Sequence, residues 1–387
     1  MWYFNNSSRV FITCNKRISP YLKLEVEGLG FEVTDTRPSG VWLNATMKDC
    51  IKLNLNLRCA SQVSYSIKEF TCNGPEDLYK IARQIAWEKI IPEDGYFSVT
   101  SNVFHPSITS PMFANVKVKD AIVDRIREKT GKRPDTGSLL NQTSLYLFWK
   151  DDKAELFIDS SGETLAKHGY RKIPGKAPML EALASATLIA TKWDRQSPFL
   201  NPMCGSSTVA IEAAMIATNR VPGLYRNNYG FMHLVGYEES MFESEKKIIV
   251  ENIKEVPGLV IHASDISDDA IYVSKVNAAI AGVEKYIQFT VSDFEQSEVP
   301  PAPGVIFFNP EYGERLGDET ELEATYSRIG DFMKKKCRGY TGYVFTGNLE
   351  LSKKIGLKPS RRIEFYTDKI DCRLLEYELY QGSRREV

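Results

Sequence analysis

The stretch FFNPEYGERLG, residues 307 to 317, joins an apolar run to a polar turn whose residues can accept hydrogen bonds from an amine. The Asn309–Pro310 step predicts a turn where a buried strand ends. The side-chain carbonyl of Asn309 and the backbone carbonyl of Pro310 can accept both N–H bonds of a planar exocyclic amine. The ring of Tyr312 offers a flat surface on which the base that carries the amine can stack. Because short motifs recur by chance, an ordinary Asn-Pro turn is the alternative for this stretch taken alone.

An exocyclic amine on an aromatic ring needs such help before it can act as a nucleophile. Its lone pair is delocalised into the ring, so the nitrogen is planar and attacks poorly. Two acceptors that bind its hydrogens draw the nitrogen toward a tetrahedral geometry and release the lone pair for attack. The motif therefore predicts chemistry on an arylamine, provided that the rest of the chain supplies a second substrate.

Three further strand-like runs precede the motif in an order that is typical of a parallel α/β sheet. PFLNPMCGSSTVAIEAAMIA, residues 198–217, predicts a short strand, a loop of small residues and a helix. LVIHASD (259–265) and IQFTVSDF (287–294) each predict a strand with an acid at or near its end. In a nucleotide-type site on such a sheet, the loop after the first strand approaches the ligand and the acid after the second binds ribose hydroxyls.

Together these residues resemble the class I S-adenosylmethionine-dependent methyltransferases that methylate amines. More narrowly, the chain is similar to the THUMP-domain RNA methyltransferases that modify guanine N2 in bacterial 23S ribosomal RNA, and the resemblance spans nearly the whole chain. The implied fold is α/β, a Rossmann-like methyltransferase sheet with a terminal antiparallel hairpin, preceded by an α+β N-terminal half. The implied domains are a ferredoxin-like domain at 1–56, a THUMP RNA-binding domain at 57–162 and a methyltransferase domain at 163–387.

Hydrophobic periodicity and turn residues predict the elements of both halves. In the N-terminal half we expect a strand at 9–14, helices at 18–30 and 48–56 around a hairpin at 31–47, a strand at 57–70, a helix at 77–90, a strand at 97–104, a helix at 118–131 and a hairpin at 143–162. In the C-terminal half we expect helices at 180–193, 208–219, 268–282 and 321–337, a strand at 342–348 and a final hairpin at 361–382.

Two connecting segments stand out between these elements. Residues 161–178 are rich in Gly, Pro and Lys and predict a joint between the halves. Residues 220–257 form a long insertion in which basic and aromatic residues alternate, which suits either stacking on bases or a plain surface segment. Ser206 and Ser207 are possible N-caps of the helix that follows the first strand.

The resemblance implies the cofactor S-adenosylmethionine, with no metal and no covalent intermediate. Asp265 would hold the cofactor ribose and Asp293 the adenine amine, while Asn309, Pro310 and Tyr312 would act on the target amine. Cys204 has small neutral neighbours and no His close in sequence, so it is not expected to be a nucleophile. The residues expected to bind the cofactor are Ala177, Pro178, Asn201, Met203, Cys204, Gly205, Ser206, Asp265, Ile266, Asp293, Phe294 and Asn309.

The expected partner is RNA, either 23S ribosomal RNA or a large-subunit precursor. Because the net charge of the chain is −1, binding would rest on local basic runs rather than on the total charge. Basic side chains fix a nucleic acid through its phosphates without reading its sequence, and an ordinary solvated charge is the alternative for each. The residues expected near phosphates are Lys117, Lys119, Arg125, Lys132, Arg133 and Arg171.

Three positions depart from the pattern of the resembled family. Asn201 stands where Asp is usual, Ser207 where Gly is usual and Glu311 where Pro is usual. None of these changes removes an atom that the chemistry needs, so an active guanine-N2 methyltransferase is the first hypothesis. The alternatives are a catalytically idle RNA-binding ribosome assembly factor, a tRNA guanine-N2 methyltransferase and a DNA adenine-N6 methyltransferase.

Composition limits the remaining possibilities. With 387 residues and 43% hydrophobic content, the chain is expected to form two or three globular domains. No apolar run approaches the ~18 residues that a membrane span needs, and the first residues lack a signal-peptide pattern. The seven cysteines are scattered and form no CxxC pair, so neither a zinc site nor a disulfide framework is expected. A reducing, cytoplasmic compartment follows as the expected location.

Overall fold

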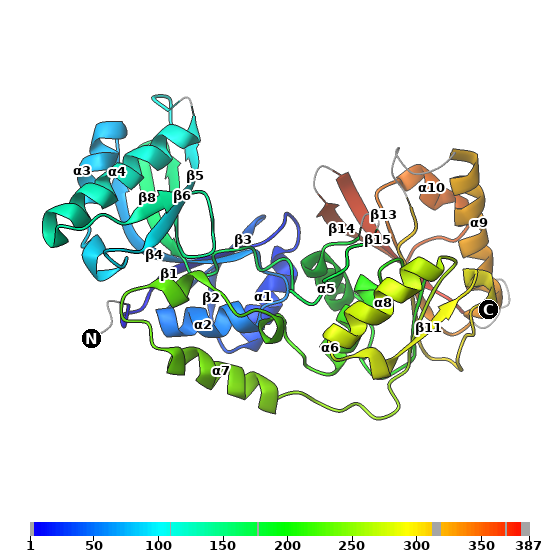
Figure 1. Ribbon diagram of the computed structural model, residues 1–387. Helices are drawn as coiled ribbons and strands as arrows, with labels where there is room; N and C mark the ends of the chain where they lie inside the picture. Colours follow the sequence, from blue (N-terminus) through cyan, green and yellow to red (C-terminus); the bar gives the residue numbers. More distant parts are fainter. Residues whose placement is uncertain (1–3, 109, 176–177, 312–318, 368–369, 381–387) are drawn as a thin grey trace. The chain divides into compact units, whose positions relative to one another are not determined.

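The computed structural model describes residues 4–108, 110–175, 178–311, 319–367 and 370–380, and the chain forms two compact units. The N-terminal unit comprises Met1–Cys14, Leu22–Ala166 and Pro222–Glu251. The C-terminal unit comprises Asn15–Tyr21, Lys167–Val221 and Asn252–Val387. The chain therefore returns to the N-terminal unit after it has begun the C-terminal one, as the colours in Figure 1 show.

An eight-stranded sheet forms the framework of the N-terminal unit, with the strand order β2-β3-β1-β4-β8-β7-β5-β6. Strand β5 runs parallel to β6 and β7, and the other neighbours are antiparallel. The β1–β4 pair makes one continuous sheet of the residues predicted as ferredoxin-like and those predicted as THUMP. The strands are β1 Ser8–Thr13, β2 Val33–Arg37, β3 Gly40–Ala45, β4 Gln62–Thr71, β5 Tyr96–Phe104, β6 Asp135–Gly137, β7 Thr143–Lys150 and β8 Lys153–Asp159.

One face of this sheet forms the core of the N-terminal unit. Val10, Tyr65, Ile158, Leu145 and Val99 follow one another in register across five strands, and each is at most 6% exposed. Side chains alternate along a strand, so their sequence neighbours point to the opposite face. Helices α3 and α4 lie side by side (Figure 1). The helices in this part of the chain are α1 Ser19–Gly28, α2 Met47–Asn56, α3 Pro75–Arg83 and α4 Pro111–Thr130.

The elements predicted for the N-terminal half occur in the predicted order, but β6 was not predicted and two helix boundaries were wrong. The helix expected at 77–90 ends at Arg83, and a separate 3₁₀ turn, η1 (Trp87–Lys89), follows it. The indole N–H of Trp87 donates to the Ala82 carbonyl at 2.7 Å, and the same carbonyl accepts the Ile85 N–H at 3.2 Å. The helix expected at 118–131 begins at Pro111, since a proline is well accommodated in the first turn.

Residues 222–251 return to the N-terminal unit and pack there closely. They form the 3₁₀ turns η2 (Pro222–Tyr225) and η3 (Gly230–His233) and helix α7 (Glu239–Glu251), which packs against α2. A Cβ on Gly223 would lie 2.6 Å from the Leu55 carbonyl oxygen, so only glycine permits this approach. Arg226 donates to the carbonyls of Thr164 at 2.7 Å and Glu163 at 3.0 Å. Arg226 thus serves packing within this unit.

A seven-stranded sheet forms the C-terminal unit, with the order β11-β10-β9-β12-β13-β15-β14. The strands from β11 to β13 are parallel, and β15 runs antiparallel to both β13 and β14. The predicted parallel sheet with a terminal antiparallel hairpin is therefore confirmed. The strands are β9 Phe199–Pro202, β10 Ile261–Asp265, β11 Ile287–Val291, β12 Val305–Phe308, β13 Thr341–Thr346, β14 Arg361–Thr367 and β15 Ile370–Glu378.

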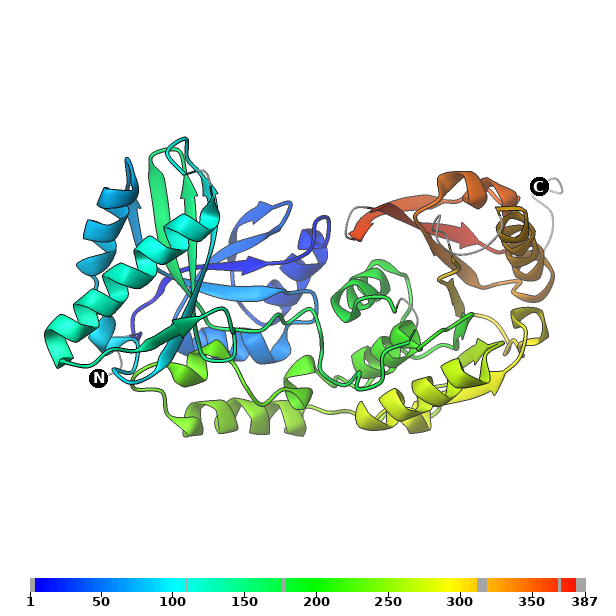
Figure 2. The same ribbon diagram turned by 45° about the horizontal axis from the view of Figure 1, so that its top comes forward.

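Helices cover both faces of this sheet (Figures 1 and 2). On one face, α9 and α10 pack over a buried core that includes Ile306, Phe308 and Val344. On the other face, the rings of Phe199 and Phe307 are 6.4 Å apart, and α6 contacts β9. None of the helices within the described ranges combines the length and apolar character that a membrane crossing requires. The helices are α5 Glu181–Ala190, α6 Thr208–Ala217, α8 Asp268–Ile280, α9 Glu319–Lys336 and α10 Leu349–Lys354, of which α10 was not predicted.

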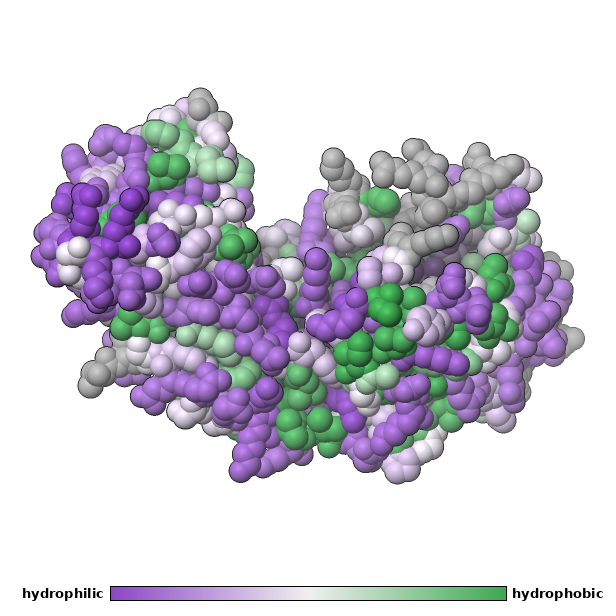
Figure 3. Space-filling model, in the orientation of Figure 1, coloured by the Kyte–Doolittle hydropathy of each residue, from purple (hydrophilic) through white to green (hydrophobic). Residues whose placement is uncertain are grey.

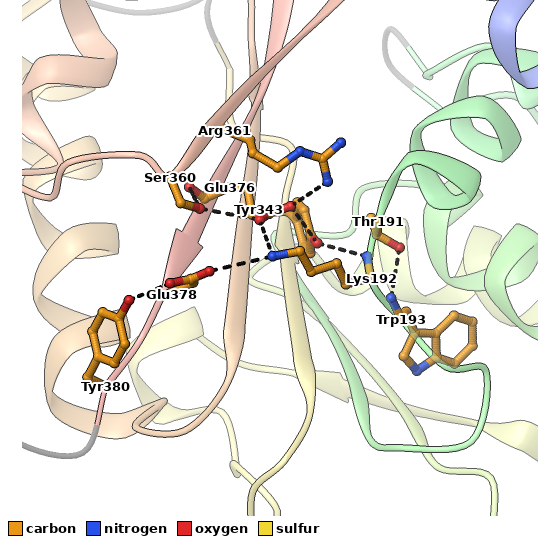
Figure 4. A network of polar contacts seen from close by, with 9 residues as sticks. All are labelled: Thr191, Lys192, Trp193, Tyr343, Ser360, Arg361, Glu376, Glu378 and Tyr380. Atoms are coloured by element: carbon orange, nitrogen blue, oxygen red, sulfur yellow. Dashed lines mark hydrogen bonds and ion pairs between the residues drawn. The ribbon is translucent and has the colours of Figure 1, made fainter.

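A buried glutamate ties the terminal hairpin to the rest of the C-terminal unit (Figure 4). Glu376, on β15, has no exposed surface. Its carboxylate accepts hydrogen bonds from Tyr343 at 3.1 Å and Arg361 at 3.0 Å, and Lys192 lies 2.8 Å away. These donors come from β13, β14 and the segment after α5. One carboxylate therefore joins three separate parts of the chain.

We expect Glu376→Ala to lower the free energy of unfolding by about 2 kcal/mol, because hydrogen bonds to a buried charged group contribute about 1.5–3 kcal/mol. Glu378→Ala is the matched control. Its carboxylate is 43% exposed and 3.5 Å from Lys192, so its loss should change stability by about 0.5 kcal/mol or less. Urea unfolding followed by circular dichroism measures both variants. Equal losses would contradict a special role for the buried carboxylate.

Candidate functional site

The carboxyl ends of the neighbouring strands β9, β10 and β12 meet at one edge of the C-terminal sheet. Residues 203–207 follow β9, Asp265 is the last residue of β10, and Asn309 directly follows β12. The structure thus brings together the predicted loop, acid and motif, although they are far apart in the sequence.

Left-handed backbone conformations alternate along the loop at 203–207. The φ angle is 56° at Met203, 54° at Gly205 and 55° at Ser207. Glycine adopts this region freely, whereas another residue in it loses about 1–2 kcal/mol. No atom of a described residue lies within 4 Å of where a Cβ on Gly205 would sit. Backbone strain of this kind is typical of a site that must hold a particular shape.

Asp265 holds this loop against the end of β10. Its Oδ2 accepts the Gly205 N–H at 2.9 Å, and its Oδ1 accepts the Ser267 N–H at 3.0 Å. Each carboxylate oxygen has further lone-pair capacity, so the group can still accept hydrogen bonds from a ligand. The predicted neighbour Ile266 is 74% exposed, which leaves an apolar surface beside the carboxylate.

Asp293 and Phe294, which follow β11, are held by residues that the sequence did not reveal. Both carboxylate oxygens of Asp293 accept from Arg328 at 2.8 Å, and one accepts the Glu295 N–H at 2.9 Å. Partial burial alone would raise the pKa of Asp293, but these hydrogen bonds outweigh it and the net pKa is lower than usual. The Phe294 side chain is buried, with its ring centroid 5.7 Å from that of Phe308, so only its backbone remains for a ligand.

The motif begins with an unsatisfied acceptor. The side-chain oxygen of Asn309 is buried and has no hydrogen-bond partner in the part of the chain that the structure describes. A buried acceptor in that state destabilises the protein by about 1–3 kcal/mol until a donor arrives. Pro310 is buried and Glu311 is exposed, and the Glu311 carbonyl accepts from the Tyr326 hydroxyl at 3.3 Å. The predicted stacking residue Tyr312 lies outside the described residues.

Asn201 links the strands on either side of the site rather than extending into the loop. It is 1% exposed, and its amide N–H donates to the Phe307 carbonyl at 3.0 Å. Its side-chain oxygen is buried and unpaired among the described residues. A carboxylate at this position could not donate to Phe307. The asparagine that replaces the usual aspartate therefore adds a hydrogen bond between β9 and the end of β12.

Ser207 occupies the N-cap position of α6, but the predicted capping role was wrong for it. Its side chain makes no capping hydrogen bond, because the residue adopts the left-handed region rather than the extended conformation of an ordinary N-cap. The preceding residue, Ser206, is 8% exposed.

The joint between the halves carries two polar residues that bind within the C-terminal unit. Arg171 donates to the Met179 carbonyl and to the Thr208 hydroxyl, each at 2.7 Å. His168 has no exposed surface and lies 2.7 Å from the Glu212 carboxylate. A contact of Arg171 with RNA stays a prediction. Pro178 is half-buried, and Ala177 lies outside the described residues.

Most of the basic residues predicted to lie near phosphates have partners within the N-terminal unit. Lys119 donates to the Gly137 carbonyl at 2.8 Å, and Arg133 is exposed. A paired side chain would have to leave its acid before it could bind a phosphate, so these contacts also stay predictions. The ion pairs are Lys117–Glu76 at 2.9 Å, Arg125–Glu88 at 2.9 Å and Lys132–Glu93 at 2.6 Å.

Cys204 lies in the loop but lacks the properties of a nucleophile. Burial raises the pKa of its thiol to about 12, so it is protonated at neutral pH. In the described ranges, no cluster of three or more His, Cys, Asp or Glu side chains could hold a metal ion.

We expect Ser207→Gly to raise the free energy of unfolding by about 0.5–1 kcal/mol. Glycine removes the left-handed strain, worth about 1–2 kcal/mol, and part of this gain is offset by its greater freedom in the unfolded chain. Ser206→Gly is the control, because φ at Ser206 is not positive and the substitution should only destabilise. Urea unfolding of both variants measures the difference, and a loss of stability in Ser207→Gly would contradict the assigned strain.

Comparison with known proteins agrees with this architecture. The family model described as an RMKL-like methyltransferase domain matches residues 168–376. The model for the THUMP domain matches 73–159, and that for the RlmL ferredoxin-like domain matches 9–64. A ribosomal RNA large subunit methyltransferase K/L of Syntrophotalea carbinolica is 32% identical over 384 residues, which cover 96% of this chain and 53% of the relative. The chain thus spans about half the length of the curated relatives it matches.

Two solved structures share the fold over almost the whole chain. A possible methylase from Clostridium difficile 630 is 27% identical with a TM-score of 0.88, covering 98% of this chain and 100% of that one. A predicted N6-adenine-specific DNA methylase from Listeria monocytogenes is 28% identical with a TM-score of 0.87, covering 98% and 97%. With the order of the strands and the matched family model, these likenesses agree on one assignment. The chain belongs to the family of RMKL-like methyltransferase domains.

Proposed function

We propose that this chain transfers a methyl group from S-adenosylmethionine to the exocyclic N2 amine of a guanine in RNA. The observation that carries the proposal is the buried side-chain oxygen of Asn309 at the carboxyl end of β12, which has no hydrogen-bond partner among the described residues. An N–H donor from a substrate would satisfy this oxygen, and the adjacent Pro310 carbonyl provides a second acceptor. Only an amine with two hydrogens uses both acceptors at once.

The residues of the chain prepare the amine for attack. Asn309 and Pro310 hold its hydrogens, and Tyr312 is proposed to stack on the base. The base must leave its own helix to reach these groups. S-adenosylmethionine supplies an electrophilic methyl carbon. The nitrogen lone pair would form the new N–C bond as the bond between sulfur and the methyl carbon breaks. The electron pair of that bond would stay on sulfur, S-adenosylhomocysteine would leave, and a proton from the nitrogen would pass to solvent. Most of the rate gain comes from holding the two reactants in line.

The loop and the acids supply a fitting place for the cofactor. Asp265 has spare acceptor capacity for ribose hydroxyls, and the exposed Ile266 offers an apolar surface for the adenine. Asp293 keeps its proposed role toward the adenine amine, with Arg328 holding its orientation. The remaining residues proposed to contact the cofactor are Ala177, Pro178, Asn201, Met203, Cys204, Gly205, Ser206 and Asn309, together with the backbone of Phe294.

RNA is favoured as the substrate by the N-terminal unit. Models for the THUMP and RlmL ferredoxin-like domains match there, and the sequence relatives are named as ribosomal RNA large subunit methyltransferases. We therefore propose 23S ribosomal RNA or a large-subunit precursor. One structural relative is titled an adenine-specific DNA methylase, which shows why the identity of the base must be measured.

The proposal includes a domain division and a location. Domains at 1–56, 57–162 and 163–387 are kept, with residues 222–251 as an extension of the last domain that packs in the N-terminal unit. The seven cysteines are free thiols, which suits a reducing cytoplasm.

Asn309→Ala is expected to lower the rate of methyl transfer by about 10²–10³-fold, the usual effect of removing one such electrostatic contact. Single-turnover assays on 23S ribosomal RNA transcripts, with N2-methylguanosine measured by mass spectrometry, give the rate. Cofactor affinity is the control and should fall far less than the rate, because Asn309 is only one of many residues proposed to contact the cofactor. A rate within threefold of the parent would remove Asn309 from the mechanism. Methylation of adenine, or of DNA in place of RNA, would overturn the assigned substrate.

Asp265→Ala is expected to weaken binding of S-adenosylhomocysteine by about 1.5–3 kcal/mol, because charge-assisted hydrogen bonds are lost. The same change releases the Gly205 N–H, so the loop also loses an anchor. Asp268→Ala, in the first turn of α8, is the control and should bind like the parent. Calorimetry measures all three proteins. If the parent gives no heat at millimolar ligand, the chain does not bind this cofactor and the idle assembly factor becomes the better reading.

A further inference from the structure

The second face of the N-terminal sheet carries a row of aromatic side chains. The rings of Phe11 and Trp42 stack with centroids 4.6 Å apart, and the Trp42 ring lies 6.1 Å from that of Phe157. Phe157 lies 5.8 Å from Tyr146 in turn. Phe148 is two residues beyond Tyr146 on β7, and its ring is 6.4 Å from that of Phe104. The aromatic row is therefore Phe11, Trp42, Phe157, Tyr146, Phe148 and Phe104.

The strand register places all members of the row on one face. Phe11 pairs with Trp42, Tyr146 with Phe157, and Phe104 with Lys150, which shares the face of Phe148. These positions alternate with the core residues described above, so they face away from the core. On β4, which lies between β1 and β8, the row is interrupted by the small side chains Ser64 and Ser66. They leave room for the large indole of Trp42 to reach Phe157.

The row becomes more exposed toward β5. Phe157 is 1% exposed and supports its neighbours, whereas Phe148 is 37% exposed and Phe104 is 62% exposed. Beside them on β5, Thr100 and Asn102 are also exposed, and the Asn102 amide donates to the Tyr146 hydroxyl at 3.1 Å. In Figure 3, hydrophobic surface gathers at the tip of the N-terminal unit over the end of β5. Exposed rings beside exposed amide and hydroxyl groups suit a ligand with both flat and polar surfaces.

Positive charges flank the row at both ends. The Arg9 guanidinium lies 4.4 Å above the Trp42 ring and pairs with Glu69 at 2.9 Å. At the other end, Lys150 and Lys153 face each other in register, both are exposed, and neither makes an ion pair with a described residue. These lysines can therefore bind an anion without first leaving an acid. The basic residues of α4, by contrast, are mostly paired.

We propose that the aromatic row binds an unpaired segment of RNA, with bases stacked on its rings and phosphates bound by Lys150 and Lys153. Every base has a flat face that can stack on an aromatic side chain, whatever the sequence. A paired A-form helix hides those faces, so a row of rings selects single strands, loops and bulges. The inference rests on the proposed RNA substrate and adds where, and in which form, the RNA is held.

The test compares the full chain and its variants by fluorescence anisotropy with a labelled oligouridylate of about 12 nucleotides, within the usual range of site sizes. A double-stranded RNA of the same length is the second probe. Phe104→Ala and Phe148→Ala should each weaken single-strand binding about 10-fold, as loss of one stacked base predicts, and should leave its salt dependence unchanged. Lys150→Ala and Lys153→Ala should each flatten the log-log salt slope by up to about 0.7. Leu24→Ala, at an apolar position on α1 that is 57% exposed, is the control and should bind like the parent.

Each outcome separates the two proposals. If the parent binds RNA and the ring variants bind equally well, or if duplex RNA binds as tightly as the single strand, the aromatic row is not the RNA site and the proposed function stands. If the parent binds neither RNA, the row does not bind an unpaired RNA segment and the inference is wrong, whereas the methylation assay on 23S ribosomal RNA transcripts still decides the proposed function. If the ring variants change the mass of the protein in solution without changing RNA affinity, the row binds a second copy of the chain and the inference is wrong.

Discussion

The hydrogen bond from the Asn201 amide to the Phe307 carbonyl fixes the distance on which the candidate site depends. The central strands β9 and β12 pair over only two register positions, Phe199 with Val305 and Leu200 with Ile306. Beyond Leu200 the strands would be free to diverge, with the loop on one and the motif on the other. The hydrogen bond from the Asn201 side chain to the Phe307 carbonyl connects β9 to β12 at one further position. Because this bond is buried, water cannot easily replace it.

The site keeps features that are unfavourable in isolation. Met203 and Ser207 adopt left-handed backbone, and the Asn309 side-chain oxygen is buried without a partner among the described residues. Such features persist only when the surrounding structure holds them. The buried core around Phe308 and the anchoring of Gly205 by Asp265 provide that support. A ligand that donates to the Asn309 oxygen would find it already oriented, which reduces the ordering that binding requires.

The sequence was sufficient for features that repeat along the chain. Alternating apolar residues and acids at strand ends predicted the parallel sheet, its terminal hairpin and the meeting of Asp265 with the 309–310 turn. Polar contacts between residues far apart in the sequence could not be predicted, because no local sequence pattern indicates them. Arg328 is 35 residues from the Asp293 carboxylate that it binds, and Lys117 is 41 residues from Glu76. A count of basic residues therefore overstated how many cations are available.

The same limit applies to the aromatic row and to the inserted segment. Phe104, Tyr146 and Phe157 each occupy an ordinary strand position, and only the order of the strands across the sheet makes them neighbours. The basic and aromatic residues near Arg226 looked suited to stacking on bases, yet Arg226 holds one segment of backbone against another. The neighbouring strand decides whether an aromatic side chain is buried in the fold or faces a ligand. Strand pairing cannot be inferred from the local sequence.

The return of residues 222–251 to the N-terminal unit has a consequence for how the protein is made. A chain leaves the ribosome from its N-terminus, and domains usually fold in that order. Here the N-terminal unit lacks α7 and the buried Phe231 and Phe242 until residue 251 has emerged. By then β9 and α6 have been synthesised, while their partner strands β10 and β12 have not. Two incomplete cores must therefore coexist on one nascent chain. The apolar helix α6 stays exposed until the remaining strands of its sheet have been synthesised.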